Sequence, residues 1–233
     1  MKKLFNYFSK TEKYLWLFSM LFIIVSFMLF DRKNYLTLSA SLFGVSSLIF
    51  VAKGNPIGQV MMVVFSLIYG IISFSFSYYG EMITYLGMSM PMAIFSLISW
   101  LRNPFNGKKS EVKINRIGKK ECCFMFLLAF AVTVAFYFIL KTFNTANLIP
   151  STISITTSFI AVYMTLRRNP YYALWYALND VVLIVLWTMA TFEDISYLSV
   201  TVCFIVFLAN DLYGFYNWLK MEKRQRKIIN GTL

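Results

Sequence analysis

The segment Arg167–Trp187, RRNPYYALWYALNDVVLIVLW, has the layout that decides the fold: two basic residues, an Asn-Pro pair and then a long apolar run. The segment Lys53–Gly70, KGNPIGQVMMVVFSLIYG, has a similar layout with a single basic residue, and the Asn-Pro pairs that begin at Asn55 and Asn169 lie 114 residues apart. Proline is favoured in the first turn of a helix, where its missing N–H costs nothing. Both segments are therefore predicted to begin long apolar helices, and an internal repeat is expected.

Apolar runs of this kind recur along the whole chain, which is 59% hydrophobic and only 14% charged over 233 residues. A soluble domain has roughly 25% charged residues. The runs reach about the 17–25 residues that a bilayer-spanning helix needs. We therefore predict an all-α integral membrane protein with eight transmembrane helices, at residues 14–30, 36–52, 57–79, 82–101, 122–141, 149–166, 171–191 and 195–219.

The spans follow the same order around each Asn-Pro pair. Each pair is preceded by a Ser- and Thr-rich span and followed by two more spans, the last of which ends in SWLRN or NWLK. This order predicts one N-terminal helix, retained rather than cleaved as a signal peptide, and then a 3+1+3 parallel repeat. The predicted segments are 1–35 (N-terminal tail and extra helix), 36–101 (first repeat), 102–148 (basic loop and linking helix), 149–219 (second repeat) and 220–233 (basic tail).

The distribution of basic residues predicts the orientation of the chain in the membrane. Of the 22 Lys and Arg residues, 19 fall in segments that eight spans place on one side: the N-terminus, Lys53, 102–120, 167–168 and 220–227. Cytoplasmic loops carry the excess of positive charge, so both termini are predicted to be cytoplasmic. The other side has Arg32, Lys33 and Lys141, with the acids Asp31, Glu81, Glu193 and Asp194.

The net charge of +12 is explained by this distribution, so no nucleic-acid partner is expected. The basic run 106–120, NGKKSEVKINRIGKK, is predicted to be a solvated cytoplasmic linker. The chain has no His, three Cys, no Ser elbow and no P-loop, which argues against an enzyme, a metal site or a bound cofactor. A structural membrane protein and a lipid-active membrane enzyme stay open as interpretations of a different class.

Polar side chains inside the last two spans predict a ligand-binding site. Trp175 and Asn179 are four residues apart and share one helix face, while Asn210, Tyr213 and Asn217 share a face of the last span. An indole, a phenol and several amides suit a small nucleoside-like ligand with an aromatic ring and hydroxyl groups. Because no Lys or Arg lies inside the spans, a nucleoside fits better than a nucleotide.

Asp180 and Asp211 are the only acids well inside a predicted span. An acid at a helix centre costs about 2.5–3.5 kcal/mol on insertion and usually faces a bundle interior or a water-filled cavity. We predict Asp180, Asp211, Asn217 and Gln59 as polar residues around the site. Three alternatives stay open: Trp175 as an interfacial anchor, the Asn side chains as packing between helices, and the two acids as helix-locking or proton-carrying groups.

The pattern Trp175-x-x-x-Asn179 followed by Asn210-x-x-Tyr213-Gly, with PMAIFSLISW at 91–100, resembles the PnuC family of bacterial vitamin transporters over residues 36–220. The resemblance implies facilitated diffusion of nicotinamide riboside, an NAD precursor, by alternating access in a full-length SWEET-like fold. Phosphorylation in the cytoplasm would then trap the substrate. It also implies binding roles for these four residues and a place in the bacterial inner membrane, surrounded by lipid.

One position departs from the family pattern. Family members often have Gln two positions after the residue equivalent to Pro91, where this chain has Ala93. Relatives in the same fold handle thiamine, riboflavin or deoxyribonucleosides, so a uniporter for one of these is the alternative within the class. Coupling to protons or ions and assembly into a homo-oligomer stay open.

Overall fold

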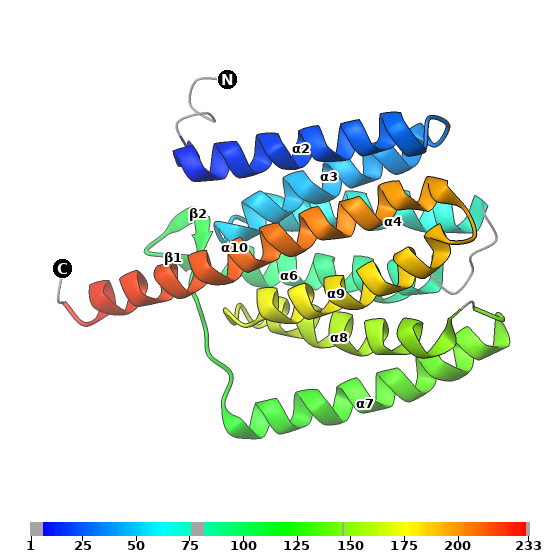
Figure 1. Cartoon of the computed structure of the whole chain (residues 1–233). Helices are drawn as coiled ribbons and strands as arrows, with labels where there is room; N and C mark the ends of the chain where they lie inside the picture. The colour runs from blue at the N-terminus through cyan, green and yellow to red at the C-terminus, as the bar shows by residue number, and fades with distance from the viewer. Residues whose placement is uncertain (1–6, 76–81, 146, 232–233) are drawn as a thin grey trace.

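The computed structural model describes residues 7–75, 82–145 and 147–231. Within these residues, eight helices are long and apolar enough to cross a membrane, which confirms the predicted number. The helices lie side by side along one common direction, and the start of α2 and the end of α10 lie at the same end of the bundle (Figure 1). Residues 76–79 of the third predicted span, Glu81, Lys2 and Lys3 lie outside the described residues.

The bounds of the helices agree closely with the predicted spans, except at the end of the last one. The first four spans are α2 (Lys10–Phe30), α3 (Tyr35–Ala52), α4 (Ile57–Ser75) and the π-helix η1 (Thr84–Ser89) continued by α6 (Met90–Arg102). The other four are α7 (Lys119–Thr142), α8 (Leu148–Leu166), α9 (Tyr172–Thr191) and the short helix η2 (Ile195–Tyr197) continued by α10 (Leu198–Ile229).

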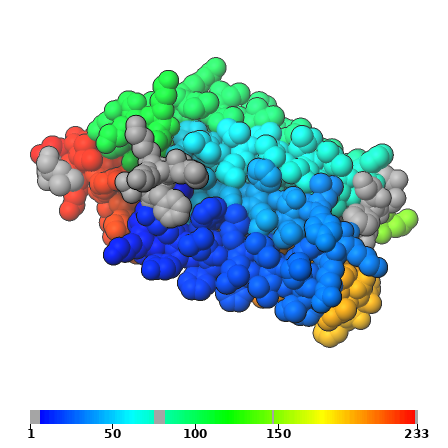
Figure 2. Space-filling view, turned by 90° about the horizontal axis from the view of Figure 1, so that it is seen from above, coloured from blue at the N-terminus to red at the C-terminus, as the bar shows by residue number. Residues whose placement is uncertain are grey.

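The described helices form two three-helix units, α3–α4–α6 and α8–α9–α10, with α7 between them in sequence. Across the units, α3 packs against α10 and α6 against α8. The additional helix α2 packs on α3 and α10, and α7 packs on α8. The space-filling view shows α2 along one face of the molecule, beside α3 (Figure 2).

The repeated Asn-Pro pairs form equivalent turns between the first and second helix of each unit. Gly54, with φ 65°, and Arg168, with φ 59°, both adopt the left-handed conformation that ends the preceding helix. The side-chain oxygens of Asn55 and Asn169 each accept a hydrogen bond, 3.0 Å long, from the backbone N–H two residues ahead. The sequence repeat is therefore a repeat of backbone geometry as well.

Two buried tryptophans join the units by hydrogen bonds that cross from one to the other. Trp100 Nε1 of α6 donates to the carbonyl of Thr165 at 2.9 Å, and Trp218 Nε1 of α10 donates to the carbonyl of Val51 at 2.8 Å. The centres of the two indole rings are 5.4 Å apart. We refer to Trp100 and Trp218 as the crossed tryptophan pair.

The residue before each tryptophan makes a second bond of the same kind. Ser99 Oγ donates to the carbonyl of Leu166 at 2.9 Å, and Asn217 Nδ2 donates to the carbonyl of Ala52 at 2.8 Å. The third helix of each unit thus binds the last turn of the first helix of the other unit. This exchange makes the two repeats a single interlocked bundle.

The basic run 106–120 is exposed over most of its length, as predicted for a solvated segment, but part of it is ordered against the bundle and is not simply a linker. It contributes to a hairpin, β1 (Pro104–Phe105) and β2 (Lys108–Val112), whose end packs against the bundle. Val112 is fully buried, and its N–H donates to the carbonyl of Gly54 at 2.9 Å. Gln225 accepts from the Ile114 N–H and donates to the Val112 carbonyl, both at 2.9 Å. These contacts come from the part of α10 that extends beyond residue 219, the end of the predicted span.

Candidate functional site

A cavity of about 100 Å³ lies between the two three-helix units and is lined by side chains from both. Its lining combines aliphatic, aromatic and polar side chains, with no Lys or Arg among the described residues. The aromatic members are Phe65, Tyr85, Tyr172, Tyr176, Phe204 and Phe207. The amide, carboxyl and hydroxyl members include Gln59, Ser66, Ser96, Asn179, Asp180 and Asp211. Such a lining can stack on a ring and hydrogen-bond to hydroxyl groups.

Four of the sequence-predicted residues, Gln59, Asn179, Asp180 and Asp211, therefore line one cavity. Helical periodicity explains how two of them reach it. On α9, Asp180 follows two tyrosines of the cavity lining, at 172 and 176, at intervals of four residues. On α10, Asp211 follows two phenylalanines of the lining at 204 and 207 with spacings of three and four. The cavity thus receives one acid from each of two neighbouring helices.

Asn179 is held in a fixed orientation by the Ser- and Thr-rich helix α8. Its Oδ1 accepts hydrogen bonds from Ser154 Oγ and Thr157 Oγ1, each 2.9 Å long. Because the oxygen makes both bonds, the Nδ2 amide group can donate to a ligand, and Asn179 is only 6% exposed. The polar residues of span 149–166 act here by orienting the amide.

Trp175 does not line the cavity, although it shares a helix face with Asn179. Its ring lies edge-on to Phe126 of α7, with the ring centres 6.1 Å apart. The four-residue spacing keeps Trp175 near Asn179, but this face of α9 is turned toward α7 and α8. The structure therefore gives Trp175 a packing contact between helices.

Asn210 and Tyr213 face α2 rather than the cavity. Asn210 Nδ2 donates to Ser19 Oγ at 2.9 Å, and the Tyr213 hydroxyl donates to Glu12 Oε1 at 3.1 Å. Glu12, Trp16 and Ser19 lie on one face of α2, which we call the polar stripe of α2. The indole N–H of Trp16 donates to Ser46 Oγ of α3 at 3.1 Å. Spacings of four and three along α2 could have revealed this stripe, but the sequence analysis did not single it out.

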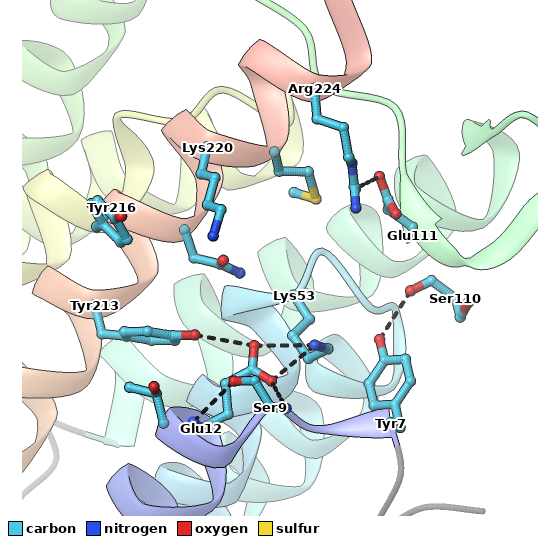
Figure 3. Close-up of a pocket in the computed structure, with 13 residues that line it drawn as sticks. Tyr7, Ser9, Glu12, Lys53, Ser110, Glu111, Tyr213, Tyr216, Lys220 and Arg224 are labelled. Carbon is cyan, nitrogen blue, oxygen red and sulfur yellow. Dashed lines mark hydrogen bonds and ion pairs between the residues drawn. The ribbon is translucent and has the colours of Figure 1, made fainter. Parts of the chain in front are cut away.

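A larger groove of about 790 Å³ lies at the end of the bundle where the hairpin packs, and Tyr213 and Asn217 line it. Figure 3 shows the carboxylate of Glu12 between Tyr213 and Lys53. Lys53 Nζ lies 2.9 Å from Glu12 Oε2 and 3.0 Å from Oε1. Glu12 is 3% exposed. Its ion pair with Lys53 ties α2 to the turn after α3, and its hydrogen bond from Tyr213 ties α2 to α10. Sequence reasoning missed Glu12 because it lies in a charged N-terminal stretch.

Ala93, the position that departs from the family pattern, also lines the central cavity and is 7% exposed. A longer side chain at this position would extend into space that a ligand could otherwise fill. Residue 93 therefore bears directly on which ligand fits.

The comparisons with known proteins agree on one family. The family model described as nicotinamide mononucleotide transporter matches residues 34–220. The nicotinamide riboside transporter PnuC of Neisseria mucosa is 26% identical over 216 residues, which cover 90% of this chain and 81% of the relative. The protein of the same description from Haemophilus influenzae is 24% identical over 193 residues, or 82% of each chain. The crystal structure of the vitamin B3 transporter PnuC superposes with a TM-score of 0.79 at 20% identity and covers 94% of each chain.

Proposed function

The chain belongs to the nicotinamide mononucleotide transporter family, and we propose that it carries nicotinamide riboside across the membrane by facilitated diffusion. Because this is a transporter family, the prediction that the chain is not an enzyme is confirmed. Relatives from Neisseria mucosa and Haemophilus influenzae are described as transporters of this riboside, which supports the same substrate for this chain.

The lining of the central cavity carries the proposal. It provides aromatic rings, amides and hydroxyl groups, and no Lys or Arg among the residues that the structure describes. Phosphate groups in proteins are usually bound by Arg or Lys or at helix N-termini. A riboside needs only hydrogen bonds to its hydroxyl groups and a stacking surface for its ring. The cavity therefore favours nicotinamide riboside over its phosphate, the mononucleotide.

Within this proposal, Asn179 and Gln59 bind polar groups of the ligand, and the aromatic side chains stack on its ring. Trp175 supports the site from outside by packing α9 on α7. Asn210 and Tyr213 support it by fastening α2 to α10. These three residues act through the helices that they join, rather than by touching the riboside.

Transport requires the two units to move apart around the cavity. At about 100 Å³ the cavity is smaller than the roughly 300–1,000 Å³ of typical ligand pockets. Opening toward one side of the membrane and then the other provides alternating access, and phosphorylation in the cytoplasm traps the riboside.

The charges support an orientation with both termini in the cytoplasm. At the end where the hairpin lies, basic side chains from four segments pair with acids: Lys53 with Glu12, Arg116 with Glu222, Arg167 with Glu121 and Arg224 with Glu111. The outer face of α2 exposes large apolar side chains, including Leu17, Phe18, Leu21 and Phe22, which lipid would cover in a bacterial plasma membrane.

A second candidate substrate rests on Ala93. Where relatives often have Gln, the short side chain leaves more room and removes an amide from the cavity wall. A deoxyribonucleoside or another vitamin, such as thiamine or riboflavin, is therefore the alternative within the same class.

Titration calorimetry on the purified protein tests the proposal, with nicotinamide riboside, the mononucleotide, deoxyadenosine and thiamine as ligands. We expect the riboside to bind at least tenfold more tightly than the mononucleotide. Asn179→Ala should weaken riboside binding by about tenfold, as expected for loss of a buried hydrogen bond. The control Asn230→Ala, at an exposed position that caps the end of α10, should not. Equal binding of the mononucleotide would contradict the proposal, and tight binding of deoxyadenosine or thiamine alone would favour the second candidate.

A further inference from the structure

Two carboxyl groups line the central cavity, and no basic side chain of the described residues pairs with either of them. Asp180 of α9 is 3% exposed and Asp211 of α10 is 4% exposed, and both line this cavity. Oδ2 of Asp180 is buried and has no hydrogen-bond partner among the described residues. Carboxyl groups that served only to lock two helices together would be expected to have both oxygens satisfied. An unsatisfied oxygen in a cavity wall points instead to a ligand.

The surroundings of this pair offer no positive charge. The residues beside them in the lining are Tyr172 and Tyr176 of α9 and Phe204 and Phe207 of α10. The cavity lining contributes no Lys or Arg from the described parts of any helix, and the whole chain has no His. A buried carboxyl group without a basic partner favours its protonated, neutral form. A cation that enters the cavity would stabilise the charged form, so these groups are suited to a positively charged ligand.

We propose that Asp180 and Asp211 form a cation subsite that binds the positively charged pyridinium ring of the transported riboside. The inference rests on the proposed function and adds the feature by which the ligand is selected. The carboxyl groups attract the ring charge, and the aromatic side chains around them, such as Tyr176 and Phe207, add cation–π attraction. Neutral nucleosides of similar size gain neither contribution and bind more weakly.

A matched pair of ligands tests the subsite without any substitution. Nicotinamide riboside carries a positive ring, whereas its reduced dihydropyridine form is neutral and nearly the same size. We expect the wild-type protein to bind the cationic form at least tenfold more tightly in titration calorimetry. Equal affinities of the two forms would overturn the subsite and leave the proposed function standing. Failure of both forms to bind would overturn the proposed function, and the subsite with it.

Two variants then locate the charge preference. Asp211→Asn and Asp180→Asn should each reduce the ratio of the two affinities to less than about threefold, mainly by weakening the cationic form. Asp194→Asn, the same chemical change at the N-cap of η2 outside the cavity, should keep the wild-type ratio. Thermal unfolding shows which variants fold, and either cavity variant is sufficient for the comparison. An unchanged ratio in a folded cavity variant would overturn the assignment.

Discussion

Asn179 and Asn210 occupy the same Asn-Asp dipeptide on adjacent helices, yet they have different neighbours. Asn179 lines the cavity and is oriented by α8, whereas Asn210 reaches across to Ser19 of α2. Residue spacing shows which side chains share a helix face, but it does not show which neighbour that face meets. For this reason Asn179, Asp180 and Asp211 could be predicted as cavity residues from sequence, while the contacts of Asn210 could not.

Asn210→Ala is expected to lower the free energy of unfolding by about 0.6–1.5 kcal/mol, because it removes an interhelical hydrogen bond to Ser19. Riboside affinity should stay within about twofold of wild type. Denaturant titration and calorimetry measure the two effects. Ser19→Ala should cost less in the Asn210→Ala background than in the wild-type chain, since both changes remove the same bond. A tenfold loss of affinity with unchanged stability would show that Asn210 touches the ligand.

Arg168→Gly is expected to stabilise the protein by about 1 kcal/mol. Arg168 has a left-handed backbone that penalises residues with a Cβ atom, and Gly54 holds the equivalent position in the first repeat. Burial lowers the pKa of the Arg168 guanidinium, and the neighbouring Arg167 lowers it further, so the side chain is also in an unfavourable environment for its charge. Unfolding in denaturant measures the gain.

The reverse change, Gly54→Ala, provides the control for Arg168→Gly. A Cβ atom at Gly54 would lie 3.0 Å from Met221 Cε and 3.1 Å from Val112 Cγ1, and the φ of 65° adds backbone strain. We expect Gly54→Ala to destabilise the protein. If both substitutions destabilised the protein, the Arg168 side chain would have to make a contact that stabilises the fold by more free energy than the left-handed backbone costs.

At the level of elements, hydrophobic length was sufficient to predict the eight spans, because each must cross the same bilayer thickness. It could not predict the end of α10, where the polar residues Glu222 and Gln225 are buried under the hairpin. The hairpin was missed for a related reason. Its strands are short and rich in Lys, and they are ordered by contacts with residues more than 100 positions away in sequence.

Gln225→Ala is expected to loosen the hairpin from α10. The substitution leaves the Ile114 N–H and the Val112 carbonyl without their side-chain partner, at a cost of about 1–3 kcal/mol. Digestion with a glutamyl endopeptidase should therefore cleave after Glu111 about tenfold faster than in the wild-type protein. Lys223→Ala, on the exposed side of the same helical turn, should leave the rate unchanged. Equal rates in the two variants would show that other contacts hold the hairpin.

For the whole molecule, the segregation of charge predicts which end meets the cytoplasm. The test uses a chain from which the three native cysteines have been removed. Single cysteines are then introduced at exposed positions, Lys109 and Asn230 at the hairpin end of the bundle and Lys33 and Glu193 at the opposite end. A maleimide that does not cross membranes, added to intact cells, should label cysteines at Lys33 and Glu193 only. Lysed cells should show labelling at all four positions. Labelling of the hairpin position in intact cells would reverse the orientation.

The crossed tryptophan pair also bears on how the chain is assembled during its synthesis. Thr165 follows Trp100 by 65 residues, whereas Trp218 is made 167 residues after Val51. The first repeat therefore enters the bilayer before either of its partners in the second repeat has left the ribosome. The hydrogen bonds between the two units are complete only when the last helix has been inserted. The first unit therefore completes its folding together with the second.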